Sequence, residues 1–220
     1  MCSSDLEGDL TYSHLSLRPM STLARVAHNG KVLGEVELSI PGEHNVENAL
    51  AVIGVGIATG QPIAELMAGI KSFTGARRRF EIRGAAKGVT VIDDYGHHPT
   101  EISVTLTSAK NYAGSGDVIV VFQPHRYSRT AAFVKEFANA LSIADRIYLL
   151  EIYSAGESPI PGVSSKLIAD LLPNAIYNPS MIEVVEEVAK ISKRGDLIIT
   201  LGAGDVSALA PVILETLNAN

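Results

Sequence analysis

Cysteine is nearly absent from this chain of 220 residues, since only Cys2 occurs. A single cysteine excludes an internal disulfide and a cysteine-based metal site, and it is typical of a reducing compartment. No apolar run approaches the roughly 20 residues that a membrane-spanning helix needs, and the first residues lack the basic and apolar regions of a signal peptide. These absences predict a cytoplasmic protein without a membrane segment.

Positive charge is also scarce. Lys and Arg number 18 against 24 Asp and Glu, which gives a net charge of -6. Binding to nucleic acid or to an anionic membrane needs a basic face, so we expect neither partner. The 46% hydrophobic and 19% charged residues are ordinary for an α/β protein, and the length suits a domain of about 140 residues plus a smaller neighbour.

Two common catalytic motifs are missing. No Gly-x-x-x-x-Gly-Lys-Ser/Thr phosphate loop occurs, so any nucleotide chemistry lacks its usual phosphate cradle within this sequence. No Gly-x-Ser-x-Gly nucleophile elbow occurs either. The adjacent pair His97 and His98 could suggest zinc, but neighbouring histidines rarely bind one ion, and we expect no metal ligands among the site residues.

Residues 1–76 predict a small first domain. Residues 10–17 and 31–40 alternate polar and apolar side chains, and Asn29-Gly30 is a strong hairpin signal, so a small antiparallel sheet is expected. Helices are expected from about residue 45 to 59 and from 62 to 72. Asn45 and Asn48 share a face at the start of the first helix, where they could contact a heteroaromatic edge or where one could simply cap the helix.

Residues 77–220 alternate strand and helix patterns. This alternation predicts a Rossmann-like, doubly wound, mostly parallel sheet of about six strands, with an antiparallel first strand joined to the second by a tight turn. The expected strands are 80–83, 89–93, 117–122, 146–150, 175–177 and 197–201. The expected helices are about 100–112, 128–141, 163–172, 180–192 and 205–217.

Two polar runs, 93–101 and 123–130, each follow an expected buried strand. Ligands of open α/β sheets bind outside the carboxyl ends of the strands, so both runs are expected to face one crevice. Arg126 and Arg129 lie one helical turn apart, and together with free backbone N–H groups they could hold a carboxylate or phosphate, or they could be exposed helix arginines. Asp94 is placed to accept from a ribose hydroxyl or to enter a magnesium shell.

Two further features have simpler alternatives. Three consecutive arginines, residues 77–79, are either a solvated charge run or groups that stabilise a phosphoryl group during transfer. Asp205 begins the last expected helix after a glycine-rich loop, and we expect it to act as a helix cap.

Six ordered motifs together resemble the Mur ligases. The resemblance spans about Gly34 to Leu209. The motifs are Gly42-x-His44-Asn45-x-x-Asn48, Arg79-Phe80-Glu81, Asp93-Asp94-Tyr95-x-His97-His98-Pro99-Thr100-Glu101, Gln123-Pro124-His125-Arg126-Tyr127-Ser128-Arg129-Thr130, Tyr153-x-Ala155-Gly156-Glu157 and Gly202-Ala203-Gly204-Asp205.

The resemblance implies an ATP-dependent, ADP-forming ligase of peptidoglycan synthesis that requires Mg²⁺. The family member whose motifs are most similar joins L-alanine to UDP-N-acetylmuramate through an acyl phosphate. By position, His44, Asn45 and Asn48 are expected near adenine, Arg79 near a phosphate and Asp94 near the ribose.

The same resemblance assigns the amino-acid substrate to the second polar run. Arg126 and Arg129, helped by His125, are expected to hold its carboxylate, with Tyr95 and His97 on the same wall of the crevice.

The family has three domains, and the resemblance covers only part of them. Residues 1–76 are expected to be the end of the central ATP-binding domain, and residues 77–220 the C-terminal Rossmann-like domain. Because the phosphate loop and the UDP-sugar domain would lie upstream, we expect the 220 residues alone to be inactive and the missing domains to be their partner. The alternative is a non-catalytic nucleotide-binding or regulatory module.

Overall fold

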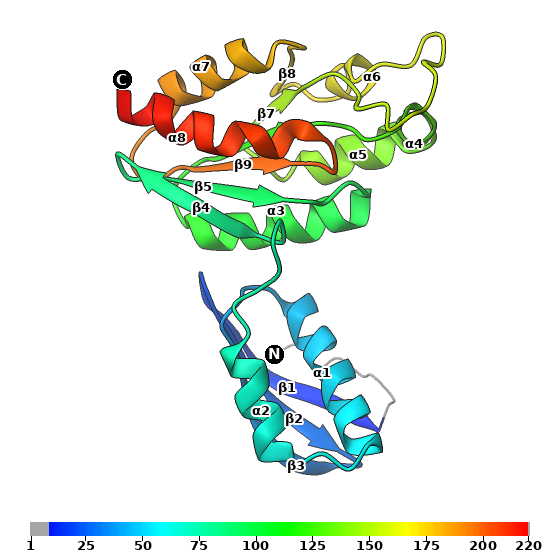
Figure 1. The fold of residues 1–220 in the computed structure, drawn as a ribbon, viewed down its shortest axis with the longest axis vertical. Helices are drawn as coiled ribbons and strands as arrows, with labels where there is room; N and C mark the ends of the chain where they lie inside the picture. The colour runs from blue at the N-terminus through cyan, green and yellow to red at the C-terminus, as the bar shows by residue number, and fades with distance from the viewer. Residues whose placement is uncertain (1–8, 220) are drawn as a thin grey trace. The chain divides into compact units, whose positions relative to one another are not determined.

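The computed structural model describes residues 9–219, so Cys2 and the first eight residues lie outside the described part. The chain forms two compact units, Met1–Gly75 and Ala76–Asn220 (Figure 1). Within residues 9–219 no helix is long and apolar enough to cross a membrane.

The first unit is a three-stranded antiparallel sheet with two helices. Strands β1 (Leu10–Leu17), β2 (Thr22–His28) and β3 (Lys31–Leu38) pair in chain order, and α1 (Glu43–Ala58) and α2 (Ile63–Ser72) follow. Asn29 and Gly30 form the predicted hairpin turn with φ of 49° and 74°. The small sheet is therefore as predicted, although β2, which the hairpin signal required, was not among the predicted strands.

The second unit contains a six-stranded sheet in the order β4-β5-β9-β6-β7-β8. Only β4 and β5 pair antiparallel, and the other neighbours are parallel, which confirms the predicted doubly wound fold. The strands are β4 (Glu81–Ala86), β5 (Val89–Asp94), β6 (Val118–Phe122), β7 (Arg146–Leu149), β8 (Ala175–Tyr177) and β9 (Leu197–Leu201).

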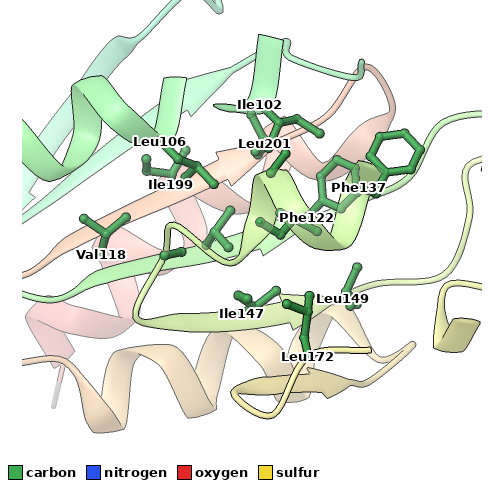
Figure 2. Close-up of a cluster of buried hydrophobic side chains, with 14 of the residues drawn as sticks. Ile102, Leu106, Val118, Phe122, Phe137, Ile147, Leu149, Leu172, Ile199 and Leu201 are labelled. Carbon is green, nitrogen blue, oxygen red and sulfur yellow. The ribbon is translucent and has the colours of Figure 1, made fainter. Parts of the chain in front are cut away.

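Helices cover both faces of this sheet, because its central strands are apolar on both sides. Val118, Val120 and Phe122 point to the face covered by α3 (Pro99–Ala113) and α5 (Val134–Leu141), as Figure 2 shows for part of this core. Ile119 and Val121 point to the opposite face, which α7 (Met181–Ile191) and α8 (Leu209–Ala219) cover. The two cores hold the strand ends, and hence the loops after them, in fixed positions.

Three helix predictions were wrong in their extent. The helix expected at 128–141 is interrupted at Phe133, between α4 (Tyr127–Ala132) and α5, where the Phe133 ring packs against Phe137. The helix expected at 163–172 is reduced to α6 (Lys166–Ala169) and turns ahead of Pro173, which disfavours helix in the residue before it. The last helix begins with a 3₁₀ turn, η1 (Asp205–Ala208), before α8.

The aromatic core of the second unit supplies a stability prediction. The Phe137 side chain is fully buried and its ring lies 5.6 Å from that of Phe122. Replacing Phe137 with alanine removes that apolar burial and leaves a cavity, so the free energy of unfolding should fall by about 3–5 kcal/mol. Urea unfolding followed by circular dichroism measures this change.

Ile182, which is 74% exposed on α7, provides the matched control. Ile182→Ala should alter the free energy of unfolding by no more than about 0.5 kcal/mol. Equal effects of the two substitutions would contradict the described core.

Candidate active site

Four rings form a row beyond the carboxyl ends of β5, β6 and β7. The centroids of Tyr95 and His97 are 5.2 Å apart, those of His97 and His125 are 5.8 Å apart, and His125 stacks on Tyr153 at 5.7 Å. A backbone bridge between His125 and Tyr153 extends the sheet at this edge. The two polar runs therefore meet in one place, as predicted from their positions at the carboxyl ends of two strands.

His97 is fixed by hydrogen bonds at its imidazole and backbone. Its Nδ1 lies 3.1 Å from the carbonyl oxygen of Tyr95 and 3.5 Å from Glu101 Oε2. A carbonyl oxygen only accepts, so Nδ1 carries a proton in this contact, and Nε2 is an acceptor whenever the ring is uncharged. Although desolvation opposes its ionisation, Glu101 has a lowered pKa because the His97 N–H, the charge of His97 and the His98 N–H act on it.

His98 points elsewhere, as the sequence predicted for two consecutive residues. Its Nδ1 accepts from the backbone N–H of Thr100 at 3.4 Å, and Glu101 completes the capping box of α3. The His98 ring packs edge-on against Phe133 at 5.2 Å. His98 therefore starts a helix and anchors a core ring, while His97 faces the row of rings.

Two buried nitrogen atoms of the second polar run lack a partner among the residues that the structure describes, namely His125 Nδ1 and Arg129 Nη1. Desolvation and the charges of Arg129, His97 and Arg126 lower the pKa of His125, so its neutral ring is favoured in the folded chain. Buried polar atoms of native proteins are nearly always hydrogen-bonded. Both atoms therefore lack the hydrogen-bond partner that a buried polar atom usually has.

Arg126 was predicted either to hold a ligand carboxylate or to be exposed, and the structure pairs it with the carboxylate of Glu157. It is not inside a helix but precedes the six-residue α4, with φ of 75°. Its Nε donates to Glu157 Oε1 at 2.7 Å, and Glu157 Oε2 accepts from the backbone N–H of Ser128 at 3.0 Å. One backbone N–H at the start of α4, that of Ser128, is therefore already taken by an internal carboxylate.

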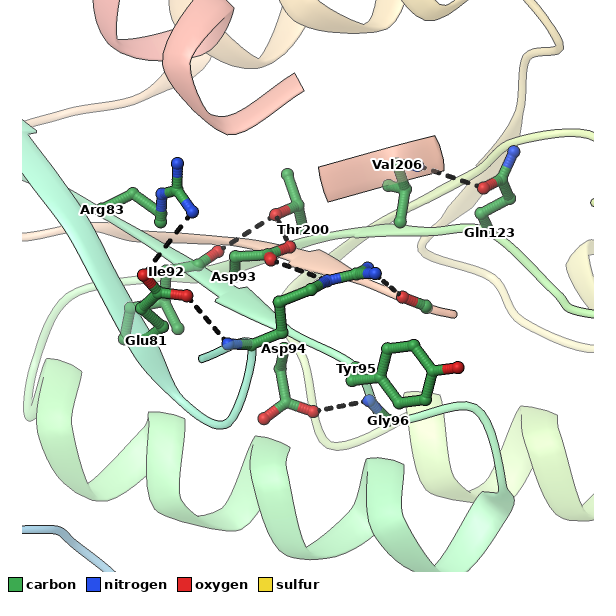
Figure 3. A network of polar contacts seen from close by, with 12 residues as sticks. Glu81, Arg83, Ile92, Asp93, Asp94, Tyr95, Gly96, Gln123, Thr200 and Val206 are labelled. Carbon is green, nitrogen blue, oxygen red and sulfur yellow. Dashed lines mark hydrogen bonds and ion pairs between the residues drawn. The ribbon is translucent and has the colours of Figure 1, made fainter. Parts of the chain in front are cut away.

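A network of polar contacts surrounds Asp93, next to Tyr95 (Figure 3). Asp93 is fully buried, and its carboxylate accepts from Arg78 Nε at 3.1 Å and from Thr200 Oγ1 at 2.7 Å. Arg78 Nη2 donates to the Gly202 carbonyl at 2.6 Å, and the guanidinium lies 4.9 Å from the centre of the Tyr95 ring. Sequence reasoning did not single out Arg78, since three consecutive arginines give no sign of which one turns inward.

Asp94 is 3% exposed, and both of its oxygens accept backbone hydrogen bonds, from Phe80 at 2.8 Å and from Gly96 at 2.7 Å. Burial raises the pKa of Asp94, although those hydrogen bonds oppose the rise. Within residues 9–219 no group of three or more His, Cys, Asp or Glu is placed to hold a metal ion. The expected ribose contact of Asp94 stays a prediction.

Arg79 lies half exposed at this edge. Its side chain is 53% exposed, and Nη1 lies 3.5 Å from Glu101 Oε1. The guanidinium is 6.0 Å from the Tyr95 ring centre. The expected phosphate contact of Arg79 also stays a prediction.

The glycine-rich loop after β9 closes the same edge from another side. A Cβ at Gly202 would lie 2.6 Å from the Gln123 carbonyl oxygen, and one at Gly204 would lie 2.7 Å from Tyr153 Cγ, so both positions require glycine. The expected Asp205 cap was wrong, because Gly204 is the N-cap of η1 and no side chain caps it. Asp205 instead accepts from Gln123 Nε2 at 2.7 Å.

In the first unit, Asn45 and Asn48 line a hollow of about 680 Å³ between α1, α2 and β3, whose other lining residues are mostly apolar. Gly42, not an asparagine, is the N-cap of α1, which rules out the cap alternative. Asn45 Nδ2 donates back to the Pro41 carbonyl at 2.7 Å. His44 lies in the first turn of α1, next to Asn45.

The family model described as "Mur ligase, glutamate ligase domain" matches residues 78–204. The chain belongs to the Mur ligase family. It is 43% identical over 214 residues to the UDP-N-acetylmuramate–L-alanine ligase of Acidothermus cellulolyticus, covering 95% of this chain and 45% of that protein. It is 47% identical to the ligase of the same name from Saccharopolyspora erythraea over 184 residues, or 82% of this chain and 38% of that one.

Solved structures of Mur ligases have a similar fold. The UDP-N-acetylmuramate–alanine ligase of Thermotoga maritima superimposes with a TM-score of 0.81 at 30% identity, over 97% of this chain and 47% of that one. A second Thermotoga maritima ligase, MurF in complex with ADP, shares the fold with a TM-score of 0.71 at 19% identity. The chain thus spans less than half of the length of the relatives it matches.

The charges around His125 give a titration prediction. The pKa of His125 should lie below the 6.5 of a free histidine, and Arg129→Ala should raise it by removing a nearby positive charge. Arg146→Ala, at the opposite end of β7, should leave it unchanged. NMR titration of the imidazole Cε1–H signals measures each pKa.

The sign of the linked stability effect follows from the direction of this shift. A histidine whose pKa is lowered by folding is protonated more readily in the unfolded chain. The free energy of unfolding that His125 contributes therefore falls as the pH drops below 6.5. A His125 pKa above 6.5, or one that Arg129→Ala does not move, would contradict the described site.

Proposed function

We propose that this chain contributes the amino-acid-binding wall and the adenine edge of an ADP-forming ligase that joins L-alanine to UDP-N-acetylmuramate in peptidoglycan synthesis. Membership of the Mur ligase family supports this, as do the printed names of the relatives that are 43–47% identical. The activity of a whole enzyme is assigned here to a chain that matches less than half of its relatives' length.

One observation in particular supports the proposal, namely that His125 Nδ1 and Arg129 Nη1 are both buried without a partner in the described part of the chain, while the charges of Arg129 and Arg126 act on His125. An amino-acid carboxylate has two acceptor oxygens, which suit a guanidinium and a neighbouring imidazole N–H. In the tautomer that carries its proton on Nδ1, His125 donates one hydrogen bond to such a carboxylate.

Tyr95 and His97 would form the wall beside this carboxylate. Since His97 Nδ1 donates to the Tyr95 carbonyl, Nε2 of the neutral ring is left as an acceptor. A substrate ammonium that approaches the row of rings can donate to this nitrogen and lose its proton there, which a nucleophilic amine must do before it attacks. Arg79 and Glu101 would balance charge at the same edge.

Each of the two units contains residues that we propose as contacts of ATP. We propose that Asn45 and Asn48, with His44 nearby, contact adenine, since a hollow of about 680 Å³ lies within the usual size of small-molecule pockets. Asp94 is proposed for the ribose and Arg79 for a phosphate. When bound, ATP supplies the phosphoryl group that activates the muramate carboxylate, so that the amine can displace phosphate and form the amide.

Mg²⁺ belongs to the proposed reaction, and within residues 9–219 no group of three or more His, Cys, Asp or Glu is placed to hold it. No residue of this chain is assigned to the ion. We further propose that residues 1–76 correspond to the central ATP-binding domain of the family and residues 77–220 to its C-terminal domain. The boundary between the two compact units, after Gly75, supports this division.

The 220 residues contain no phosphate loop, so a chimera tests the function. The upstream part of the Acidothermus cellulolyticus ligase, which this chain does not match, is fused to it, and L-alanine-dependent phosphate release is measured. Arg129→Ala should lower kcat/KM for L-alanine by about 30- to 1,000-fold, because a charged hydrogen-bonded contact is worth about 2–4 kcal/mol.

Arg146→Ala is the control, and it should leave kcat/KM within about twofold. An active chimera whose kcat/KM is unchanged by Arg129→Ala would remove the carboxylate assignment. A folded chimera without any dependence on L-alanine would favour the non-catalytic module instead.

A further inference from the structure

Glu157 lies at the edge of the candidate site, and none of the roles proposed above includes it. Its carboxylate accepts three hydrogen bonds. Oε1 lies 2.7 Å from Arg126 Nε and 2.6 Å from Ser128 Oγ, and Oε2 lies 3.0 Å from the Ser128 N–H. One carboxylate therefore joins the side chain of Arg126 to the first turn of α4.

The loop that carries Glu157 is fastened to the end of β6. Tyr153 N–H donates to the Pro124 carbonyl at 2.9 Å, and Arg126 N–H donates to the Tyr153 carbonyl at 2.8 Å. Ala155 and Gly156 then both have positive φ, 50° and 85°, which turns the chain back. The loop after β7 thus places Glu157 against Arg126 from a framework that the sheet holds.

Arg126 needs such a support. With φ of 75° it occupies the left-handed region, which a non-glycine residue keeps only when its surroundings hold it there. Its side chain is 47% exposed and long, so without a partner it would sample several rotamers. Glu157 fixes Nε, and the Nη1/Nη2 edge of the planar guanidinium is the edge that can take a second carboxylate.

We propose that Glu157 is a positioning residue, which orients the Arg126 guanidinium so that its outer edge faces the substrate carboxylate beside Arg129 and His125. This inference rests on the proposed function. Bonds from the Ser128 hydroxyl and N–H, with desolvation opposing, and then the Arg126 contact lower the pKa of Glu157 to about 2. The support is therefore charged at any pH at which the enzyme would work.

A substrate assay of the chimera tests the proposal. In Glu157→Gln an amide NH₂ replaces one oxygen, so the side chain can no longer accept from all three donors. The KM for L-alanine should rise about tenfold or more, while the KM for ATP is unchanged and kcat at saturating L-alanine stays within about threefold. Glu183→Gln is the control, since Glu183 lies in the first turn of α7 and accepts from Asn178.

If Glu157 only stabilised the fold, Glu157→Gln would change the kinetic constants in a different way. Loss of folded protein lowers kcat without moving the KM for L-alanine and lowers the melting temperature in parallel. That result, or a KM for L-alanine that is unchanged or lower in Glu157→Gln, would overturn the proposal.

A second measurement uses the 220-residue chain itself and no substrate. Exchange of the Arg126 Nε–H proton with water, followed by ¹⁵N NMR, should be slow, and Glu157→Ala, which removes both acceptor oxygens, should make it fast. Slow exchange that survives the substitution overturns the positioning role. A chimera without L-alanine-dependent activity overturns the proposed function, whereas the Arg126 signal still decides whether Glu157 orients this side chain.

Discussion

The buried carboxylate of Asp93 connects the parts of the chain that form the candidate site. Burying a charge is costly unless a partner and further hydrogen bonds compensate it, and Asp93 has both, in Arg78 and Thr200. The same guanidinium reaches the Gly202 carbonyl and the Tyr95 ring. Removing one partner of such a pair typically lowers the free energy of unfolding by about 3–5 kcal/mol. Because Arg78 precedes β4, Asp93 lies in β5 and Thr200 lies in β9, the network keeps the ends of these three strands together.

Around this anchor, acidic side chains restrain the basic groups of the site. Glu101 holds the His97 backbone and lies near Arg79, and Glu157 holds Arg126. Arg129 has a different environment, since one buried nitrogen lacks a partner in the described part of the chain. Arg78, Arg79 and Arg126 are thus each paired with a carboxylate of the protein, and orienting a side chain before a ligand binds lowers the entropic cost of binding.

The sheet could be predicted because each strand is an apolar run between polar turns, and alternation with helices fixes parallel pairing. The meeting of His97 with His125 follows from that topology alone. The inward turn of Arg78 and the pairing of Arg126 with Glu157 could not be predicted, because long side chains choose partners through loop geometry that has no sequence period. The break at Phe133 was missed for a similar reason, since an aromatic ring drawn into the core outweighed a continuous helical pattern.

The proposed function depends on His125 and Arg129 binding the carboxylate of the amino-acid substrate. A crystal structure of the chimera with L-alanine tests it most directly. The account predicts a carboxylate oxygen within hydrogen-bond distance of Arg129 Nη1 and another near His125 Nδ1, with the ammonium toward His97 Nε2. L-alanine bound elsewhere, with both nitrogen atoms still unpartnered, would contradict it.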